Sequence, residues 1–221
     1  MKSYEFLIEN DIKAIKNEFN MIDEQIVFAK AVRDNCGYYL EQVNYQPLSK
    51  YALYRGLKNV KTNMFANKIR LNDRKPLNSS NILHTALNNF YMENYGAPFR
   101  NAMFCTGEYQ LAQEFGDAYT VFPVGNFKFL WDMDSKDIYV DYLNFNRQEH
   151  LIKHLAKKEF RDKEKVVDAF IKHRISKHKF DNTDLMTAIN RGHEIMLRGS
   201  SYLACRLPKN IELGIEAIIK L

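Results

Sequence analysis

The sequence predicts an α+β fold in which short strands form a split core, helices flank the strands, and a helical part precedes them. Apolar residues recur at spacings of three and four in several segments, which is typical of amphipathic helices. Short apolar runs bounded by Gly, Pro or polar residues lie between those segments and predict strands. A hydrophobic share of 46% in 221 residues, with 15 Phe and 13 Tyr, is enough for a sizeable core.

The chain divides into a helical segment at residues 1–50 and one compact unit at 51–221. In the first part, one apolar stripe predicts a single helix over residues 10–36, with Gly37 as its C-cap. The stripe consists of Ile12, Ile15, Phe19, Ile22 and Ile26. The chain contains only nine Gly and five Pro residues, which argues against long linkers.

The second part begins with a strand at 51–57 and an irregular segment at 63–77 that holds the turn Asp73–Pro76. Ser79 or Ser80 is placed to N-cap a helix over 81–95. The apolar stripe of that helix is Ile82, Leu83, Leu87, Phe90 and Tyr91.

Further elements follow in short succession. We predict strands at 101–105, 119–124 and 127–132, a short helix at 108–115, and a loop at 133–137. Residues 147–177 are predicted to be helical with a break near Arg161. The runs 195–197 and 202–207 resemble a closing hairpin, and 211–221 is a last strand or a helix.

Some classes of protein are excluded by composition. No apolar run approaches the roughly 20 residues that span a bilayer, and the N-terminus lacks the apolar core of a signal peptide. We therefore expect a cytoplasmic protein without membrane contact. The odd set Cys36, Cys105 and Cys205 lacks metal-type spacing.

Histidines do not indicate a metal site either. His150 and His154 are four residues apart, but no third ligand accompanies them at helical spacing. A solvated basic face is the expectation for these two and for His173 and His178.

Positive charge is concentrated in one segment. The formal net charge of the chain is +5, whereas Lys153 to Lys179 alone contains ten Lys and Arg against four Asp and Glu. This segment belongs to a basic helical insert at about 147–180. It is either a charged solvent face or a surface that follows the phosphates of RNA or DNA without sequence preference.

Two distant charges carry the chemistry. Arg55 ends the apolar run Leu53-Tyr54 just before Gly56, and Glu194 heads the run Ile195-Met196-Leu197. An arginine can hold a diphosphate bidentately, and a carboxylate can stabilise a cation that develops during bond cleavage. NAD combines both features. A side chain next to Glu194 on a strand faces the opposite side, so His193 is not expected in the same pocket.

A third segment lies between these two and completes a family resemblance. Phe104-Cys105-Thr106-Gly107 ends a strand and is followed by Ala112 and Phe115-Gly116. With Leu53-Tyr54-Arg55-Gly56 and Glu194-Ile195-Met196-Leu197, this order resembles ADP-ribosyltransferases of the arginine–serine–glutamate class, phage-encoded and bacterial-toxin members above all. The resemblance covers roughly residues 51–207 and implies an ADP-ribosyltransferase-like core, placed in the host cytoplasm if the chain is phage-encoded.

The resemblance also implies residue roles. Arg55 would contact the NAD phosphates, the backbone of Gly56 would hold the nicotinamide amide, and Thr106 would support the site as the middle of the family's Ser-Thr-Ser element. Glu194 would hydrogen-bond the nicotinamide ribose and stabilise the cation-like transition state. The further side chains implied at the NAD site are Tyr54, Phe104, Tyr109 and Phe115; core packing is the alternative for the last two.

Three positions depart from the family pattern. Cys105 and Gly107 replace its first and last Ser, and Gly192 stands where arginine-modifying members carry a second Glu. Arginine is therefore not the indicated acceptor. The expected function is transfer of ADP-ribose from NAD, without a metal, to nucleic acid or a protein side chain. An NAD glycohydrolase and a non-enzymatic nucleic-acid-binding protein are the alternatives.

Overall fold

Eight strands form two antiparallel four-stranded sheets in the computed structural model, which describes residues 2–72, 79–155 and 163–221. The first sheet has the order β1-β4-β8-β2 and the second has the order β3-β7-β5-β6. The strands are β1 Tyr54–Leu57, β2 Met64–Lys68, β3 Met103–Cys105, β4 Asp117–Val124, β5 Lys128–Asp132, β6 Phe180–Asp181, β7 Ile195–Arg198 and β8 Ser201–Cys205. Antiparallel sheets with separate helices agree with the predicted α+β class.

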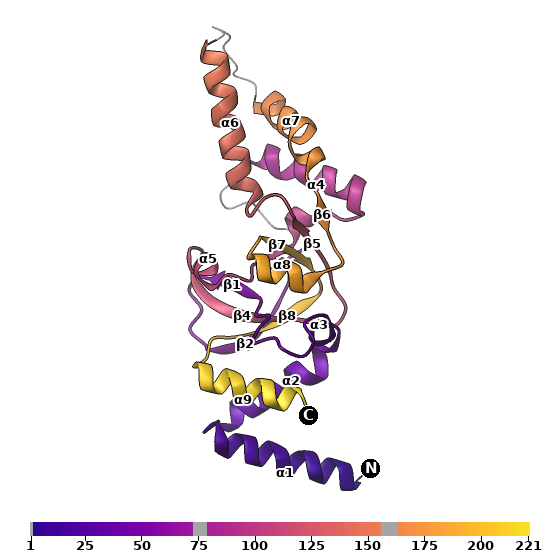
Figure 1. The fold of residues 1–221 in the computed structure, drawn as a ribbon, viewed down its shortest axis with the longest axis vertical. Coiled ribbons are helices and arrows are strands. Elements are labelled where there is room, and N and C mark those ends of the chain that lie inside the picture. The colour runs from indigo at the N-terminus through magenta and orange to yellow at the C-terminus, as the bar shows by residue number, and fades with distance from the viewer. Residues whose placement is uncertain (1, 73–78, 156–162) are drawn as a thin grey trace.

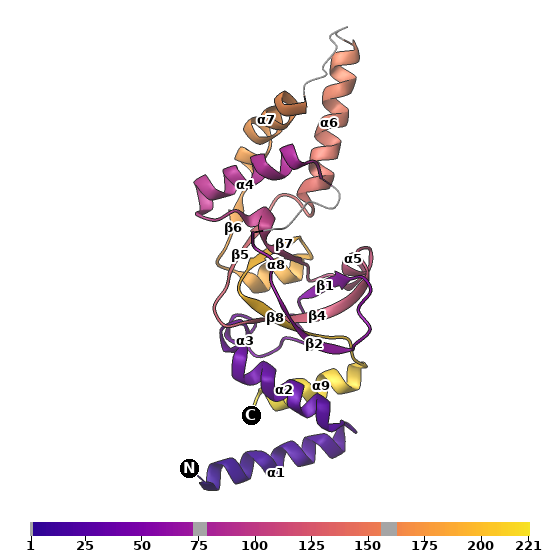
Figure 2. The same ribbon diagram turned by 180° about the vertical axis from the view of Figure 1, so that it is seen from behind.

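Helices cover both ends of the molecule (Figure 1). The helices are α1 Lys2–Glu18, α2 Asp23–Asn35, α3 Gly37–Gln42, α4 Asn81–Tyr95, α5 Tyr109–Gln113, α6 Ile138–Leu155, α7 Lys163–His173, α8 Leu185–Arg191 and α9 Lys209–Ile219, with 3₁₀ turns η1 Phe99–Asn101 and η2 Ile175–Lys177. Figures 1 and 2 show α4, α6 and α7 at one end, α1, α2 and α9 at the other, and the sheets between them.

The second sheet is buried on both faces. Ile195 and Leu197 of β7 belong to the hydrophobic cluster that includes the first sheet, whereas Met196 between them belongs to the cluster under α4 and α7. This division follows from the alternation of side chains along a strand. A strand that is buried on both faces reads as a continuous apolar run, as Ile195-Met196-Leu197 does.

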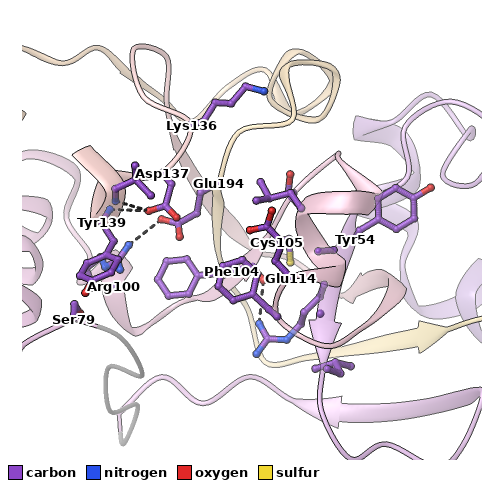
Figure 3. Close-up of a pocket in the computed structure, with 18 of the residues that line it drawn as sticks. Tyr54, Ser79, Arg100, Phe104, Cys105, Glu114, Lys136, Asp137, Tyr139 and Glu194 are labelled. Atoms are coloured by element: carbon purple, nitrogen blue, oxygen red, sulfur yellow. Dashed lines mark hydrogen bonds and ion pairs between the residues drawn. The ribbon is translucent and has the colours of Figure 1, made fainter. Parts of the chain in front are cut away.

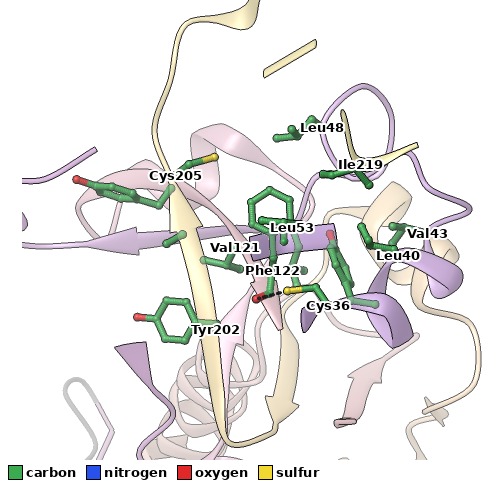
Figure 4. Packing of buried hydrophobic residues seen from close by; sticks show 14 of the residues in the cluster. Cys36, Leu40, Val43, Leu48, Leu53, Val121, Phe122, Tyr202, Cys205 and Ile219 are labelled. Carbon is green, nitrogen blue, oxygen red and sulfur yellow. Dashed lines mark hydrogen bonds between the residues drawn. The ribbon is translucent and has the colours of Figure 1, made fainter. Parts of the chain in front are cut away.

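The N-terminal helices and the strands contribute to one hydrophobic cluster. Figure 4 shows Cys36, Leu40 and Val43 beside Phe122 of β4 and Ile219 of α9. The three cysteines are buried and form no disulfide within the described residues, and burial raises the pKa of Cys36 to about 12. A thiol with such a pKa stays protonated near neutral pH, so Cys36 packs in the core and does not act as a nucleophile.

Several predicted elements are confirmed and others are wrong. The helix at 81–95 forms with Ser80 as its N-cap, since the Ser80 hydroxyl accepts the N–H of Leu83 at 3.2 Å. The single helix at 10–36 is wrong: α1 ends at Glu18, and Asn20 adopts a φ of 52° before α2 begins. Asn tolerates this left-handed conformation better than most residues. Gly37 is not a C-cap, because it begins α3.

The predicted hairpin near the C-terminus is also wrong. Strand β7 pairs with β3 and β5, whereas β8 pairs with β4 and β2 in the other sheet. Each strand has partners on both of its edges, so the chain crosses between the sheets at Gly199 and Ser200 instead of folding back.

The remaining differences concern boundaries. The segment 63–77 contains the strand β2, which pairs only with β8 at the edge of the first sheet. Helix α6 begins at Ile138, earlier than predicted, and 211–221 is helical. The turn Asp73–Pro76 and the break near Arg161 lie outside the described residues.

One buried carboxylate joins α9 to the loop after α3. Glu216 is buried, and its oxygens accept the N–H groups of Leu48 and Ser49 at 3.0 and 2.7 Å and the Ser49 hydroxyl at 2.7 Å. Lys220 also pairs with it at 2.7 Å. Burial opposes ionisation of Glu216, but the hydrogen bonds from Lys220, Ser49 and Leu48 outweigh it, so the pKa of Glu216 is lowered.

We expect Glu216→Ala to lower the free energy of unfolding by about 2–3 kcal/mol, since it leaves buried backbone donors without an acceptor. Because the folded-state pKa is lowered, the stabilisation by Glu216 is present above its unfolded pKa of about 4.3 and is lost as the pH falls through the folded value. Urea unfolding between pH 3 and 7 measures both effects. Exposed Glu41 is the control position, and equal midpoints for Glu216→Ala and Glu41→Ala would contradict the prediction.

Candidate functional site

A cavity of about 700 Å³ opens between the two sheets at β1 and β3 and is bordered by α4, α5 and the start of α6. Six of the predicted residues besides Glu194 line it. They are Tyr54, Arg55, Gly56, Phe104, Thr106 and Phe115. Figure 3 shows Glu194 with Arg100 and Asp137 on one side of this cavity and Cys105, Glu114 and Tyr54 on the other. The structure therefore brings together three sequence segments that are distant in the chain.

The segment that carries Glu194 is anchored at each of its residues. The Thr106 hydroxyl donates to Gly192 O at 3.0 Å, and His193 Nδ1 donates to Asp132 O at 2.6 Å. The Glu194 N–H donates to Lys136 O at 2.9 Å. Because different elements supply these contacts, the position of Glu194 is fixed by the tertiary structure.

His193 and Glu194 face different surroundings, as alternation along a strand predicts. The His193 ring packs edge-on against Trp131 with centroids 5.5 Å apart, and Trp131 is buried. His193 does not line the cavity that Glu194 lines.

Arg100 is a cavity residue that sequence reasoning missed. It lies in η1, is only 7% exposed, and its Nη1 donates to Glu194 Oε1 at 2.9 Å. Its guanidinium carbon lies 4.5 Å from the centroid of the Phe104 ring. A lone arginine before a short strand carries no recognisable signal, because its partner is 94 residues away in the sequence.

Arg55 reaches into the cavity from β1. Its Nη1 donates to Phe104 O at 3.2 Å, so Arg55 also ties β1 to β3. Its Nε is buried and has no hydrogen-bond partner. A buried guanidinium nitrogen without an acceptor is costly. Because Arg55 lines the cavity, its positive charge can attract an anionic ligand there.

The backbone of Gly56 faces away from the first sheet. Tyr54 N–H and C=O exchange hydrogen bonds with Thr106 on the side opposite β4, whereas Leu53 accepts from Val121 of β4. Backbone groups alternate in direction along a strand, so the N–H and C=O of Gly56 point to the same side as those of Tyr54. A Cβ at Gly56 would lie 2.1 Å from Ala112 O, which explains the glycine.

Two other glycines leave no free space for a side chain. A Cβ at Gly107 would lie 1.9 Å from Ile189 O, so a serine cannot be accommodated there without movement of α8. Gly192 has a φ of 65°, and a Cβ there would lie 3.0 Å from Glu108 Oε2. A glutamate at 192 would therefore be strained and would lie beside another carboxylate.

Thr106 holds the framework together. Its hydroxyl donates to Gly192 O and accepts the N–H of Glu108 at 3.1 Å. Both of these hydrogen bonds are to backbone groups, so Thr106 links the end of β3 to the start of α5 and to the segment before Glu194.

The predicted aromatic residues divide into two groups. Phe104 and Phe115 line the cavity, and Phe115 is 44% exposed, so it is not a core residue. Tyr109 lies outside this cavity and lines a neighbouring hollow of about 500 Å³ that also includes Tyr54. The Tyr54 and Tyr109 rings pack edge to face at 5.4 Å.

The basic segment is described in part. Residues 156–162, with Lys157, Lys158 and Arg161, lie outside the described residues. Arg174 pairs with Asp141 through Nε and Nη2, each at 3.1 Å, so this arginine holds α6 to the end of α7. The expectation of a solvated His178 is wrong: its side chain is 6% exposed, and Nδ1 lies 2.6 Å from buried Asp132.

No metal site is evident in the part of the chain that is described, since no group of three His, Cys, Asp or Glu is placed to hold an ion. The side chains of His150 and His154 lie outside the described residues. Within residues 2–72, 79–155 and 163–221, none of the helices combines the length and the apolar character that crossing a membrane requires.

Comparisons of the chain with protein-family models, with curated protein sequences and with solved structures found no match.

Proposed function

We propose that the protein is an NAD-dependent mono-ADP-ribosyltransferase with an ADP-ribosyltransferase-like core. The observation that carries the proposal is the convergence of Arg55, the outward-facing backbone of Gly56 and the anchored Glu194 on one cavity. The residues come from β1 and from the segment before β7, in the order and strand context that the family resemblance implies.

The cavity suits NAD in size and in chemistry. A volume of about 700 Å³ falls within the range of small-molecule sites. Arg55 and Lys58 offer positive charge for a diphosphate, and Phe104, Phe115 and Tyr139 offer ring surfaces. The strand-edge N–H and C=O of Gly56 match the two hydrogen-bonding groups of a carboxamide.

Each residue then has a distinct part in the reaction. Arg55 and the backbone of Gly56 bind and orient the substrate, and Thr106 holds the segment that carries Glu194. As the glycosidic bond to nicotinamide lengthens, positive charge grows on the ribose. The Glu194 carboxylate stabilises this charge more strongly in the transition state than in the ground state.

The acceptor that we propose is nucleic acid. Helix α6 begins at the cavity, where Tyr139 and Val140 line it, and extends away from the sheets (Figure 1). The basic segment begins at Lys153 in the last turn of α6, and its described part continues in α7 and η2. A polyanion that contacts this segment could therefore extend along α6 to the cavity, whereas Gly192 removes the carboxylate that marks arginine-modifying relatives.

One experiment tests both the reaction and the acceptor. The protein is incubated with adenine-labelled NAD and cell lysate, and the products are divided between protease and nuclease. We expect label that survives protease and is lost with nuclease. The reverse pattern would indicate a protein acceptor, and nicotinamide release without labelled macromolecule would indicate a glycohydrolase. Intact NAD and no label would refute the transferase.

Arg55→Lys tests the phosphate contact. We expect the KM for NAD to rise about tenfold or more with kcat changed little, since a hydrogen bond to a charged group is worth about 1.5–3 kcal/mol and Lys lacks the planar fork of Arg. Steady-state nicotinamide release measures both constants. The matched control is Arg206→Lys, because Arg206 pairs with Asp117 outside the cavity. Equal KM values for the two variants would show that Arg55 does not contribute to NAD binding.

A further inference from the structure

We propose that Arg100 is a positioning residue that keeps the Glu194 carboxylate oriented and ionised for the reaction. This inference rests on the proposed function of Glu194, and no role for Arg100 follows from the family resemblance. The Arg100 and Glu194 side chains are 9% and 21% exposed, and Arg100 Nη1 lies 2.9 Å from Glu194 Oε1.

The backbone of Arg100 is fixed by a polar network on α4. Asn88 Oδ1 accepts the Arg100 N–H at 2.9 Å, and Asn88 Nδ2 donates to Asn101 Oδ1 at 3.1 Å. His84 Nε2 also lies 2.9 Å from Asn101 Oδ1. The turn that carries Arg100 is therefore held to α4 at Arg100 itself and at the next residue, Asn101.

Two further contacts fix the guanidinium group of Arg100. The Phe104 ring lies 4.5 Å from its central carbon, and Glu194 accepts from Nη1. A planar guanidinium between a ring and a carboxylate has little rotational freedom, so it determines where the carboxylate lies. Arg100 Nε is buried without a hydrogen-bond partner, so Glu194 is the ion-pair partner that compensates the buried charge.

The charge of Arg100 also favours the ionised form of Glu194. An opposite charge at hydrogen-bonding distance lowers the pKa of a carboxyl group, and a carboxylate must be ionised to stabilise a cation. Among the described residues, the other titratable groups that line this side of the cavity are His84 of α4, Lys136 and Asp137 before α6, and Tyr139 of α6. Buried Tyr91 of α4 also interacts electrostatically with Arg100 and Glu194. Burial keeps the pKa of Tyr91 well above its usual value, so its hydroxyl stays neutral.

Arg100→Gln tests the proposal through the pH dependence of nicotinamide release. We expect kcat to fall on the order of tenfold, because the carboxylate loses its orientation. We also expect the acidic limb of the pH–rate profile to move up by about one pH unit, because the neighbouring positive charge is gone. Arg100→Lys retains the charge and should keep the limb near its wild-type position.

The matched control is Arg198→Gln. Arg198 donates to Pro98 O at 2.8 Å and so contacts the same turn without contacting Glu194. We expect the acidic limb of the pH–rate profile of Arg198→Gln to stay at its wild-type position. In the background of Glu194→Gln, Arg100→Gln should cause no further loss, since the two residues act through one carboxylate.

A direct titration separates this inference from the proposed function. The ¹³C NMR signal of Glu194, identified with Glu194→Gln, should titrate at a higher pH in Arg100→Gln than in the wild type. An unchanged limb and an unchanged titration would overturn the proposal. If the wild type released no nicotinamide, the proposal of transferase activity would be refuted. The NMR titration would still decide whether Arg100 controls the ionisation of Glu194.

Discussion

Glu194→Gln should reduce nicotinamide release by on the order of 10²-fold to 10³-fold, the effect of removing one preorganised electrostatic group from an active site. Gln has the shape of Glu and retains an oxygen that can accept from Arg100 Nη1, which lies 2.9 Å from Glu194 Oε1. It lacks the negative charge that the developing cation requires. The loss should appear in kcat, because the carboxylate acts mainly in the transition state.

The measurement is release of labelled nicotinamide under single-turnover conditions, with NAD binding determined in parallel by calorimetry. We expect the variant to bind NAD as tightly as the wild type. The control is Glu41→Gln, an exposed change on α3 outside the cavity. Turnover by Glu194→Gln at the rate of Glu41→Gln would show that Glu194 is not the catalytic carboxylate.

Gly107→Ser should lower the free energy of unfolding by about 3 kcal/mol, in the upper range for overpacking a filled site. A Cβ at this position would lie 1.9 Å from Ile189 O and 2.8 Å from Ile189 Cα. These are backbone atoms near the end of α8, so no side-chain rotation relieves the contact. Helix α8 leads through Gly192 to Glu194, and its displacement should also impair the site.

The matched control is Gly37→Ser, since a Cβ at Gly37 meets no heavy atom within 4 Å. Urea unfolding followed by circular dichroism compares the two variants. Coincident unfolding curves would mean that residue 107 has room for a side chain and that the glycine has another cause.

The local elements were predictable where one signal acts within a few residues. Ser80 caps α4 because its hydroxyl is placed to accept the Leu83 N–H, and the apolar runs at β5 and β7 form strands. The strand β2 was missed because an edge strand has one neighbour, β8, and because its apolar run Met64-Phe65-Ala66 is short and lies between polar residues. The break after α1 was missed because Asn20 interrupts the helix without interrupting the apolar stripe.

The pairing of strands was not available from local pattern. Two short strands joined through Gly199 and Ser200 look like a hairpin, but β7 and β8 belong to different sheets. The choice depends on which other strands offer open edges. Those partner strands lie far away in the chain. Which of them pairs with β7 and which with β8 is therefore determined only when the whole core assembles.

The sequence by itself determined the α+β class, the order of the three site segments, and the charges that Arg55 and Glu194 bring to them. These follow from side-chain chemistry and from periodicities within a few residues. Only the tertiary structure decided that both residues line one cavity and that Arg100 pairs with Glu194. It also decided that Gly107 and Gly192 stand where a side chain would be too close to neighbouring atoms. Those features depend on distances of a few ångströms between residues that are far apart in the chain, and no local pattern encodes such distances.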